Sequence, residues 1–233
     1  MLPRPLLLSV EFICIALALT LVYLFFKVFK AKRSVILLGL PLGFLFLTIS
    51  YSFLAVHMII LTFQSVNPIS SSLMWMRVIA QSVGFVMITF SYIFASRYQE
   101  TTKRSYLYIL LGMTSLIASA FAVLLLLVIS PSELASVYSY NDIFAVFNLS
   151  LLSFIVLFLT RKLQLANKVA DLISAPIAFF FLWIGQFSFL IWSFAVGGDL
   201  ALLMTQLARV IGFVIFVQIY YMASKELAIN ASK

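Results

Sequence analysis

The segments VGFVMITFSYIFASR (residues 83–97) and IGFVIFVQIYYMASK (residues 211–225) lie 128 positions apart and are closely alike. Six of their fifteen aligned pairs are identical: Gly84/Gly212, Phe85/Phe213, Val86/Val214, Tyr92/Tyr220, Ala95/Ala223 and Ser96/Ser224. Two segments this apolar resemble each other partly through composition alone. Whether the chain contains a duplication therefore depends on where other matches fall.

The composition of the chain indicates a membrane protein. Of its 233 residues, 64% are hydrophobic and 9% are charged, which leaves too few polar side chains to cover a water-soluble globule. A membrane-spanning helix needs about 20 apolar residues to cross about 30 Å of hydrocarbon. Seven such runs occur, at residues 5–29, 35–63, 72–96, 106–130, 142–160, 174–197 and 199–224. We expect an all-α integral membrane protein in which residues 1–233 form a single domain of seven transmembrane helices.

The basic residues predict the orientation of this domain. Twelve Lys and Arg residues occupy the tail and the connections after the first, third and fifth predicted helices, whereas Arg4 alone lies on the other side. Short cytoplasmic loops retain basic residues during insertion. We therefore expect the N-terminus outside and the C-terminus in the cytoplasm, and we interpret the net charge of +8 as mostly a signal of this orientation. The distribution fits a multi-pass protein of the cell membrane in contact with lipid, and it offers no nucleic-acid footprint.

Further matches follow the same order in both halves. PLGFLFL (41–47) aligns with PIAFFFL (176–182), and YSFL (51–54) aligns with FSFL (187–190) after a shift of one residue. We interpret this order as a duplication of three helices, with repeat A at about 5–97 and repeat B at about 141–225, joined by a linker helix at about 105–130. Each triplet begins outside and ends inside, so the repeats are parallel.

In topology, this three-plus-one-plus-three arrangement resembles microbial rhodopsins and sugar transporters of the SWEET class. The rhodopsin resemblance implies a retinal-binding lysine near the middle of the seventh helix, but this helix has no lysine before Lys225. The SWEET resemblance implies a Pro-Gln signature, which neither Pro41-Leu42 nor Pro176-Ile177 supplies. We therefore expect no retinal and assign neither family.

Small residues recur at matching places in the third and seventh predicted helices. Ala80 and Gly84 lie four residues apart, as do Ala208 and Gly212. This spacing lets helix backbones approach closely in lipid. We expect the third helix of each triplet to be its central, tightly packed member.

A few ionisable and polar side chains lie within the predicted spans. Such groups are costly in hydrocarbon, so they usually face the bundle interior and find partners. At about 1.5 Å per residue, Glu11 and Arg77 lie roughly 6 to 10 Å deep and Arg209 roughly 13 Å deep, in the outer half of the membrane. The candidate ligand-binding residues are Glu11, His57, Arg77, Gln81, Gln186 and Arg209, with Asn148 as a further candidate.

Three interpretations of these residues remain open. In the first, Glu11 neutralises one arginine, the other arginine extends to the outer interface, and His57 bonds to a carbonyl. In the second, the same groups line a cavity open to the outside that suits a carboxylate or phosphate group. In the third, the charges pair with another membrane subunit.

Several kinds of chemistry are unsupported by the sequence. Cys14 is the one cysteine and His57 the one histidine, which excludes a disulfide, bis-histidine haem and a multi-histidine metal centre within the chain. We find no hydrolase triad, P-loop or dinucleotide motif. We therefore expect no catalytic residues, metal or cofactor, and no enzyme activity.

The function that these observations favour is a binding or transport module for a small anionic or polar solute that enters from the outer side. The alternatives are a non-catalytic structural or regulatory subunit of a larger membrane complex, or a seven-helix sensor without a soluble output domain.

Overall fold

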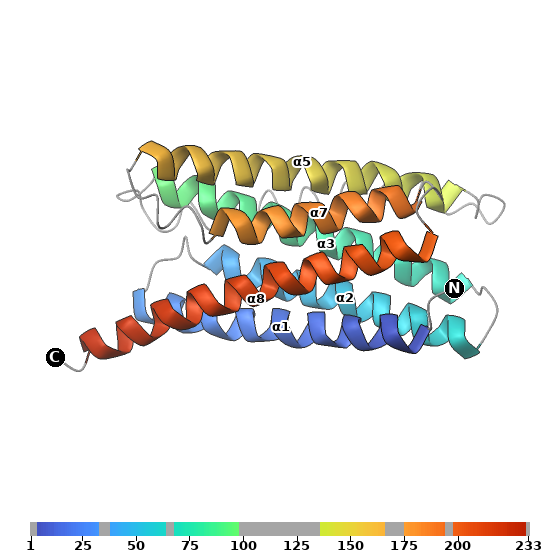
Figure 1. The fold of residues 1–233 in the computed structure, drawn as a ribbon, viewed down its shortest axis with the longest axis horizontal. Coiled ribbons are helices and arrows are strands. Elements are labelled where there is room, and N and C mark those ends of the chain that lie inside the picture. Colours follow the sequence, from blue (N-terminus) through green and yellow to red (C-terminus); the bar gives the residue numbers. More distant parts are fainter. Residues whose placement is uncertain are drawn as a thin grey trace.

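Six α-helices form the part of the chain that the computed structural model describes, residues 4–32, 38–63, 68–97, 136–165, 175–193 and 198–231. They are α1 (Arg4–Lys32), α2 (Gly39–Phe63), α3 (Pro68–Arg97), α5 (Ser136–Leu165), α7 (Ala175–Ser193) and α8 (Gly198–Ala231) (Figure 1). Each helix is long and apolar enough to cross a membrane. Six predicted spans are thereby confirmed as such helices, and the predicted span 106–130 lies outside the described residues.

The sequence explains how these helices form in an apolar environment. Helices suit lipid because they satisfy their own backbone hydrogen bonds. Proline occupies the first turn of α2, α3 and α7, where its missing N–H removes no helical bond. Hydroxyl groups within the helices donate to the carbonyl four residues earlier, as in Thr48, Thr89, Ser91, Ser153 and Thr160. These hydroxyls are therefore satisfied without leaving their own helix.

The helices pack as a ring of two triplets. α2 packs between α1 and α3, α7 packs between α5 and α8, and the triplets meet where α1 contacts α8 and α3 contacts α5. The second helix of each triplet contacts both of the others, whereas the third helix, α3 or α8, is the most buried of its triplet. In Figure 1, α1, α3, α5 and α8 all begin at the end that holds the N-terminus, whereas α2 and α7 run the other way.

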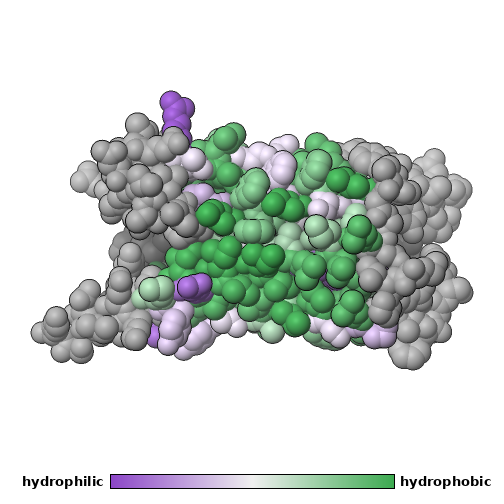
Figure 2. Space-filling view, viewed as in Figure 1, coloured by the Kyte–Doolittle hydropathy of each residue, from purple (hydrophilic) through white to green (hydrophobic). Residues whose placement is uncertain are grey.

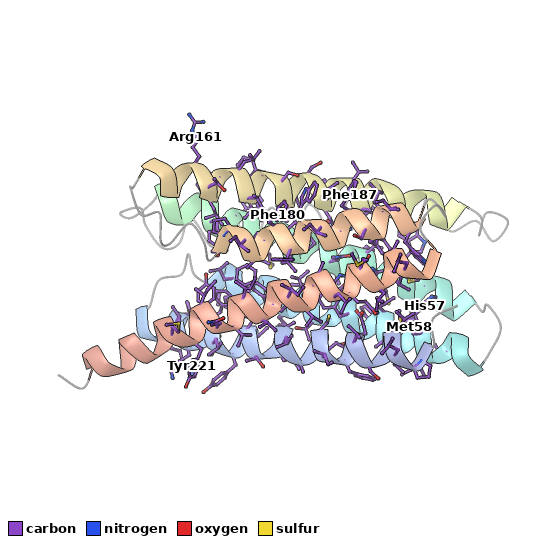
Figure 3. The ribbon with its side chains drawn as sticks, in the orientation of Figure 1. His57, Met58, Arg161, Phe180, Phe187 and Tyr221 are labelled. Carbon is purple, nitrogen blue, oxygen red and sulfur yellow. The ribbon has the colours of Figure 1, made fainter. Side chains whose placement is uncertain are left out.

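An apolar surface surrounds the middle of the bundle. Figure 2 shows hydrophobic side chains across most of the described part of this face. Large apolar side chains are well exposed on several helices, among them Phe12, Tyr23, Leu157 and Leu200. Arg161 projects outward near the end of α5 (Figure 3). An apolar belt of this kind fits contact with a lipid bilayer.

Aromatic side chains fill the centre of the ring, where the two triplets meet. Phe44 of α2 contacts Phe213 and Phe216 of α8, and Phe216 also contacts Phe179 of α7. All four side chains are completely buried. The centre of the bundle is therefore a packed aromatic core.

Two of the glycines lie at close contacts between helix backbones. A Cβ on Gly84 would lie 2.8 Å from the carbonyl oxygen of Gly43 on α2. A Cβ on Gly212 would lie 2.9 Å from the carbonyl oxygen of Ala178 on α7. In each case a leucine of the neighbouring helix, Leu47 or Leu182, covers the same position. The small residues Gly84 and Gly212 thus stand where backbones touch, as predicted.

Alanine substitutions test these contacts. Gly84→Ala or Gly212→Ala should lower the free energy of unfolding by about 1–3 kcal/mol, because the new methyl group pushes against a backbone carbonyl. The measurement is thermal unfolding of the purified protein in detergent. Val214→Ile adds a methylene on the exposed face of α8 and should leave the melting temperature unchanged. Equal melting temperatures for all three variants would contradict the close contacts.

Candidate functional site

Three charged side chains from three helices lie inside the bundle. Glu11 on α1, Arg77 on α3 and Arg209 on α8 are 0%, 1% and 2% exposed. All three stand in the first half of their helices, and these helices begin at the same end of the bundle (Figure 1). On α1 the inward stripe Leu7, Glu11, Cys14 and Ala18 follows helical spacing, which carries the carboxylate into the interior.

Glu11 is held by two residues of α8. Its Oε1 lies 3.8 Å from Nη1 of Arg209, an ion pair too long to be a hydrogen bond. Its Oε2 accepts a hydrogen bond from Nε2 of Gln206 at 3.1 Å, and the same nitrogen donates to the carbonyl of Leu7. Sequence reasoning missed Gln206. Its position three residues before Arg209 on one helix face was the available signal.

The two arginines stack on aromatic rings from the other triplet. The guanidinium carbon of Arg209 lies 5.1 Å from the ring centre of Tyr51 on α2. That of Arg77 lies 4.4 Å from the ring centre of Phe189 on α7. Cation–π contacts of this kind are strongest where water is excluded. Neither aromatic residue was among the predicted site residues.

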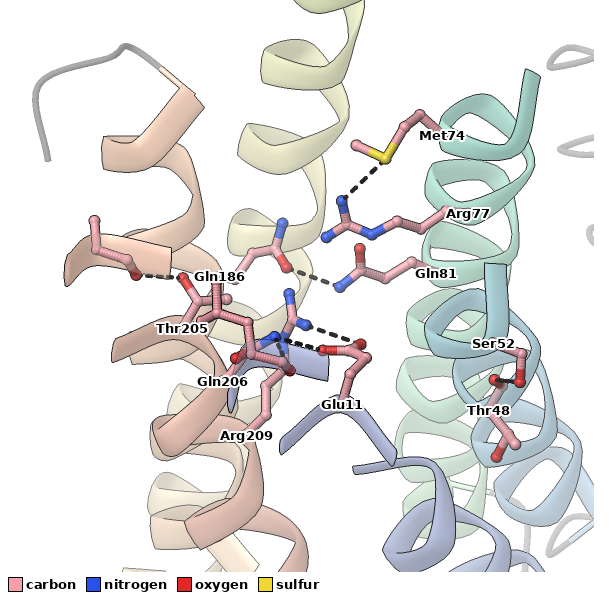
Figure 4. A network of polar contacts seen from close by, with 12 residues as sticks. Glu11, Thr48, Ser52, Met74, Arg77, Gln81, Gln186, Thr205, Gln206 and Arg209 are labelled. Carbon is pink, nitrogen blue, oxygen red and sulfur yellow. Dashed lines mark hydrogen bonds and ion pairs between the residues drawn. The ribbon is translucent and has the colours of Figure 1, made fainter. Parts of the chain in front are cut away.

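A hydrogen bond between two amides joins the triplets beside the arginines. Nε2 of Gln81 on α3 donates to Oε1 of Gln186 on α7 at 2.9 Å. Figure 4 shows this pair with Arg77, Arg209 and Glu11 in one polar cluster. The structure therefore brings together five of the six predicted candidates, from four different helices.

His57, the sixth candidate, lies half-buried on α2. It follows Tyr51 by six residues and stands toward the end of the bundle that holds the N-terminus (Figure 3). Asn148 of α5 is 1% exposed, and neither atom of its amide has a hydrogen-bond partner. A buried polar side chain is thus present on α5 as well.

Several buried nitrogen atoms in this cluster have no hydrogen-bond partner. They are Nε and Nη2 of Arg77 and both Nη atoms of Arg209. Neither arginine extends to the interface, as one of the sequence interpretations required, because both side chains are buried. A buried donor without a partner is costly, and a buried charge is more so. The site therefore contains capacity for hydrogen bonding and for negative charge that the described side chains leave unused.

Among the described side chains, the charges of the cluster do not balance. Arginine remains protonated in proteins, so Arg77 and Arg209 contribute two positive charges, and Glu11 is the acidic group whose side chain lies beside them. Within the described residues there is no group of three or more His, Cys, Asp or Glu that could hold a metal ion. The cluster is thus a positively charged centre suited to an anion.

Charge removal tests the Glu11–Arg209 pair. Glu11→Gln keeps an oxygen for Gln206 but removes the countercharge of Arg209, so it should destabilise the protein by about 3–5 kcal/mol. Arg209→Gln should also destabilise it. The loss of unfolding free energy in the double variant should be smaller than the sum of the two single losses by more than 1 kcal/mol. The measurement is thermal or denaturant unfolding in detergent, and strictly additive losses would show that the two side chains do not interact.

Comparison of the chain with protein-family models, with characterised proteins and with solved structures found no significant match. A functional assignment for this chain therefore depends on the geometry and the charge of the site.

Proposed function

We propose that this chain is a seven-helix membrane module that binds or transports a small solute, holding an anionic group of that solute between Arg77 and Arg209. The observation that carries this proposal is the pair of buried guanidinium groups beside a single carboxylate, with four guanidinium nitrogens that have no hydrogen-bond partner. In a low-dielectric interior, an anion would supply both the missing charge and the missing hydrogen-bond acceptors. The proposal includes no catalytic residue, metal or cofactor.

The proposed topology has seven crossings, with the N-terminus outside. In support, α3 ends and α5 begins at opposite ends of the bundle (Figure 1), and the proposed further crossing would join these two ends. Lys27, Lys30 and Arg161 lie at the ends of α1 and α5 and favour that end as cytoplasmic.

An internal duplication would explain the architecture. Helices α1, α2 and α3 make the same neighbour contacts as α5, α7 and α8. The close contact of Gly84 with α2 has a counterpart in that of Gly212 with α7. The hydroxyl groups of Tyr92 and Tyr220, at matching positions, lie 3.1 Å apart. These features fit two copies related by a twofold axis along the bundle.

The burial pattern refines the alignment of the copies. The buried positions of α7 from Pro176 to Phe189 all have buried counterparts 135 residues earlier in α2. This register pairs Tyr51 with Gln186, without the one-residue shift that the YSFL and FSFL match indicated. The contact of Arg209 with Tyr51 then corresponds to the contact of Gln81 with Gln186. The site would thus be a duplicated contact in which one glutamine has become an arginine, or the reverse.

Cysteine labelling tests the topology. In a variant without Cys14, Ser132→Cys should react with a membrane-impermeant maleimide in intact cells, and Thr102→Cys should react only after permeabilisation, because a crossing separates them. Equal labelling of both positions in intact cells would contradict a seventh crossing. Lys233→Cys serves as the control for the cytoplasmic side.

Anion binding tests the site. Sodium acetate, phosphate and chloride should be added to the purified protein at constant ionic strength, and at least one should raise the melting temperature by several degrees in a saturable manner. The rise should disappear in Arg77→Gln/Arg209→Gln and persist in Val214→Ile. No response to any of the three anions would reject the proposal, and co-purification of a stoichiometric partner would favour a subunit of a larger complex.

A further inference from the structure

We infer that the solute is a small monocarboxylate, and that its carboxylate binds side-on to the Nε–Nη2 edge of Arg77. This inference rests on the proposed function and specifies the chemical class of the solute. Three features carry it: the free edge of one guanidinium group, the charge of the cluster and the unpartnered amide of Asn148.

The partners of Arg77 leave one edge of its guanidinium free. Nη1 faces the sulfur of Met74 at 3.9 Å, and Phe189 covers the plane of the group. Nε and Nη2 are buried and have no hydrogen-bond partner. Their two N–H bonds point the same way, at the spacing of the two oxygens of a carboxylate. A spherical halide can engage this edge but cannot fill both positions with separate oxygens.

Among the described side chains, Arg77 has no acidic partner, whereas Arg209 has one. Arg209 already lies 3.8 Å from Glu11, whereas the contacts of Arg77 are a thioether and an aromatic ring. These contacts are weak in comparison with a charge-assisted hydrogen bond. A ligand carboxylate at Arg77 would give each guanidinium group one carboxylate.

The charge count selects a monoanion. Two guanidinium groups and Glu11 leave one positive charge uncompensated among the described side chains of the cluster. Water can satisfy the free N–H groups, but it cannot neutralise that charge. A dianion such as hydrogen phosphate would leave an excess of negative charge in the same low-dielectric space. One carboxylate brings the cluster to neutrality.

We assign to Asn148, which lies at a similar height on the neighbouring helix, the contact with a second polar group of the same solute. The ring of Phe144, one turn before Asn148, contacts the ring of Trp75, two residues before Arg77. Because α3 and α5 run in the same direction (Figure 1), Asn148 and Arg77 differ in height by only about 3 Å. Nδ2 and Oδ1 of this buried amide offer one donor and one acceptor, which suits a hydroxyl group adjacent to the carboxylate.

The experiment compares four probes by isothermal titration calorimetry on the purified full-length protein in lipid nanodiscs, near neutral pH. The probes are sodium acetate, glycolate, phosphate and chloride at equal ionic strength. Acetate should bind about tenfold more tightly than phosphate or chloride. Glycolate should bind about threefold more tightly than acetate, because one added hydrogen bond contributes about this factor to affinity.

Two variants separate recognition from folding. Arg77→Lys keeps the positive charge but loses the bidentate pair of N–H groups. The affinity for acetate should therefore fall about tenfold, while the affinity for chloride is unchanged. Asn148→Ala should bring glycolate affinity down to that of acetate and leave acetate unaffected. Each variant is first checked for an unchanged melting profile without ligand. The order of affinities for the four probes is measured on the wild-type protein, so this part of the test does not depend on the folding of any variant.

The possible results distinguish the monocarboxylate assignment, the role of Asn148 and the proposed function. Tighter binding of phosphate or chloride than of acetate, or an unchanged preference in Arg77→Lys, would overturn the monocarboxylate assignment while the anion-binding function stands. Equal affinities for glycolate and acetate would overturn the role of Asn148. Absence of binding by all four probes would reject the proposed function itself and this inference with it.

Discussion

Close backbone contact at Gly84 and Gly212 is the constraint on which the rest of the bundle depends. Lipid is as apolar as the side chains of the helices, so burying these side chains adds little to helix association, and packing distance becomes decisive. Each glycine lets one helix approach a carbonyl oxygen of its neighbour, and a leucine closes over the contact. Those contacts fix the α2–α3 and α7–α8 pairs, and the aromatic core fills the space that remains between the triplets.

The polar cluster exists because this packing brings equivalent faces of the two triplets together. Gln81 and Arg209 occupy matching places, and each reaches a side chain of the opposite triplet, Gln186 or Tyr51. Apolar packing is alike in the two halves, whereas the charged positions differ. Arg77, for instance, corresponds to Thr205, whose hydroxyl is satisfied within its own helix. On the proposed duplication, an asymmetric, charged site thus lies inside a nearly symmetric scaffold.

The charge of that site is also what makes it unusual in energetic terms. A buried ion pair with good geometry already contributes little to stability, and an excess buried cation is costly. Here the Glu11–Arg209 ion pair is long, and the guanidinium group of Arg77 contacts an aromatic ring and a thioether. A protein that keeps such a group in its interior has a use for it that packing alone does not explain. Anion binding is the use that we propose for it, on the basis of the free donors.

The sequence by itself determined the helices and their number among the described residues, because each is a continuous apolar run bounded by polar or turn-forming residues. It also identified Glu11, Arg77, Gln81, Gln186 and Arg209, since polar side chains within such runs are few. Only the tertiary structure decided which helix is central in each triplet, that Glu11 faces Arg209 and Gln206, and that Arg77 stacks on Phe189. Those outcomes depend on the rotation and height of each helix relative to residues far away in the chain, and helical periodicity specifies a face without specifying its neighbour.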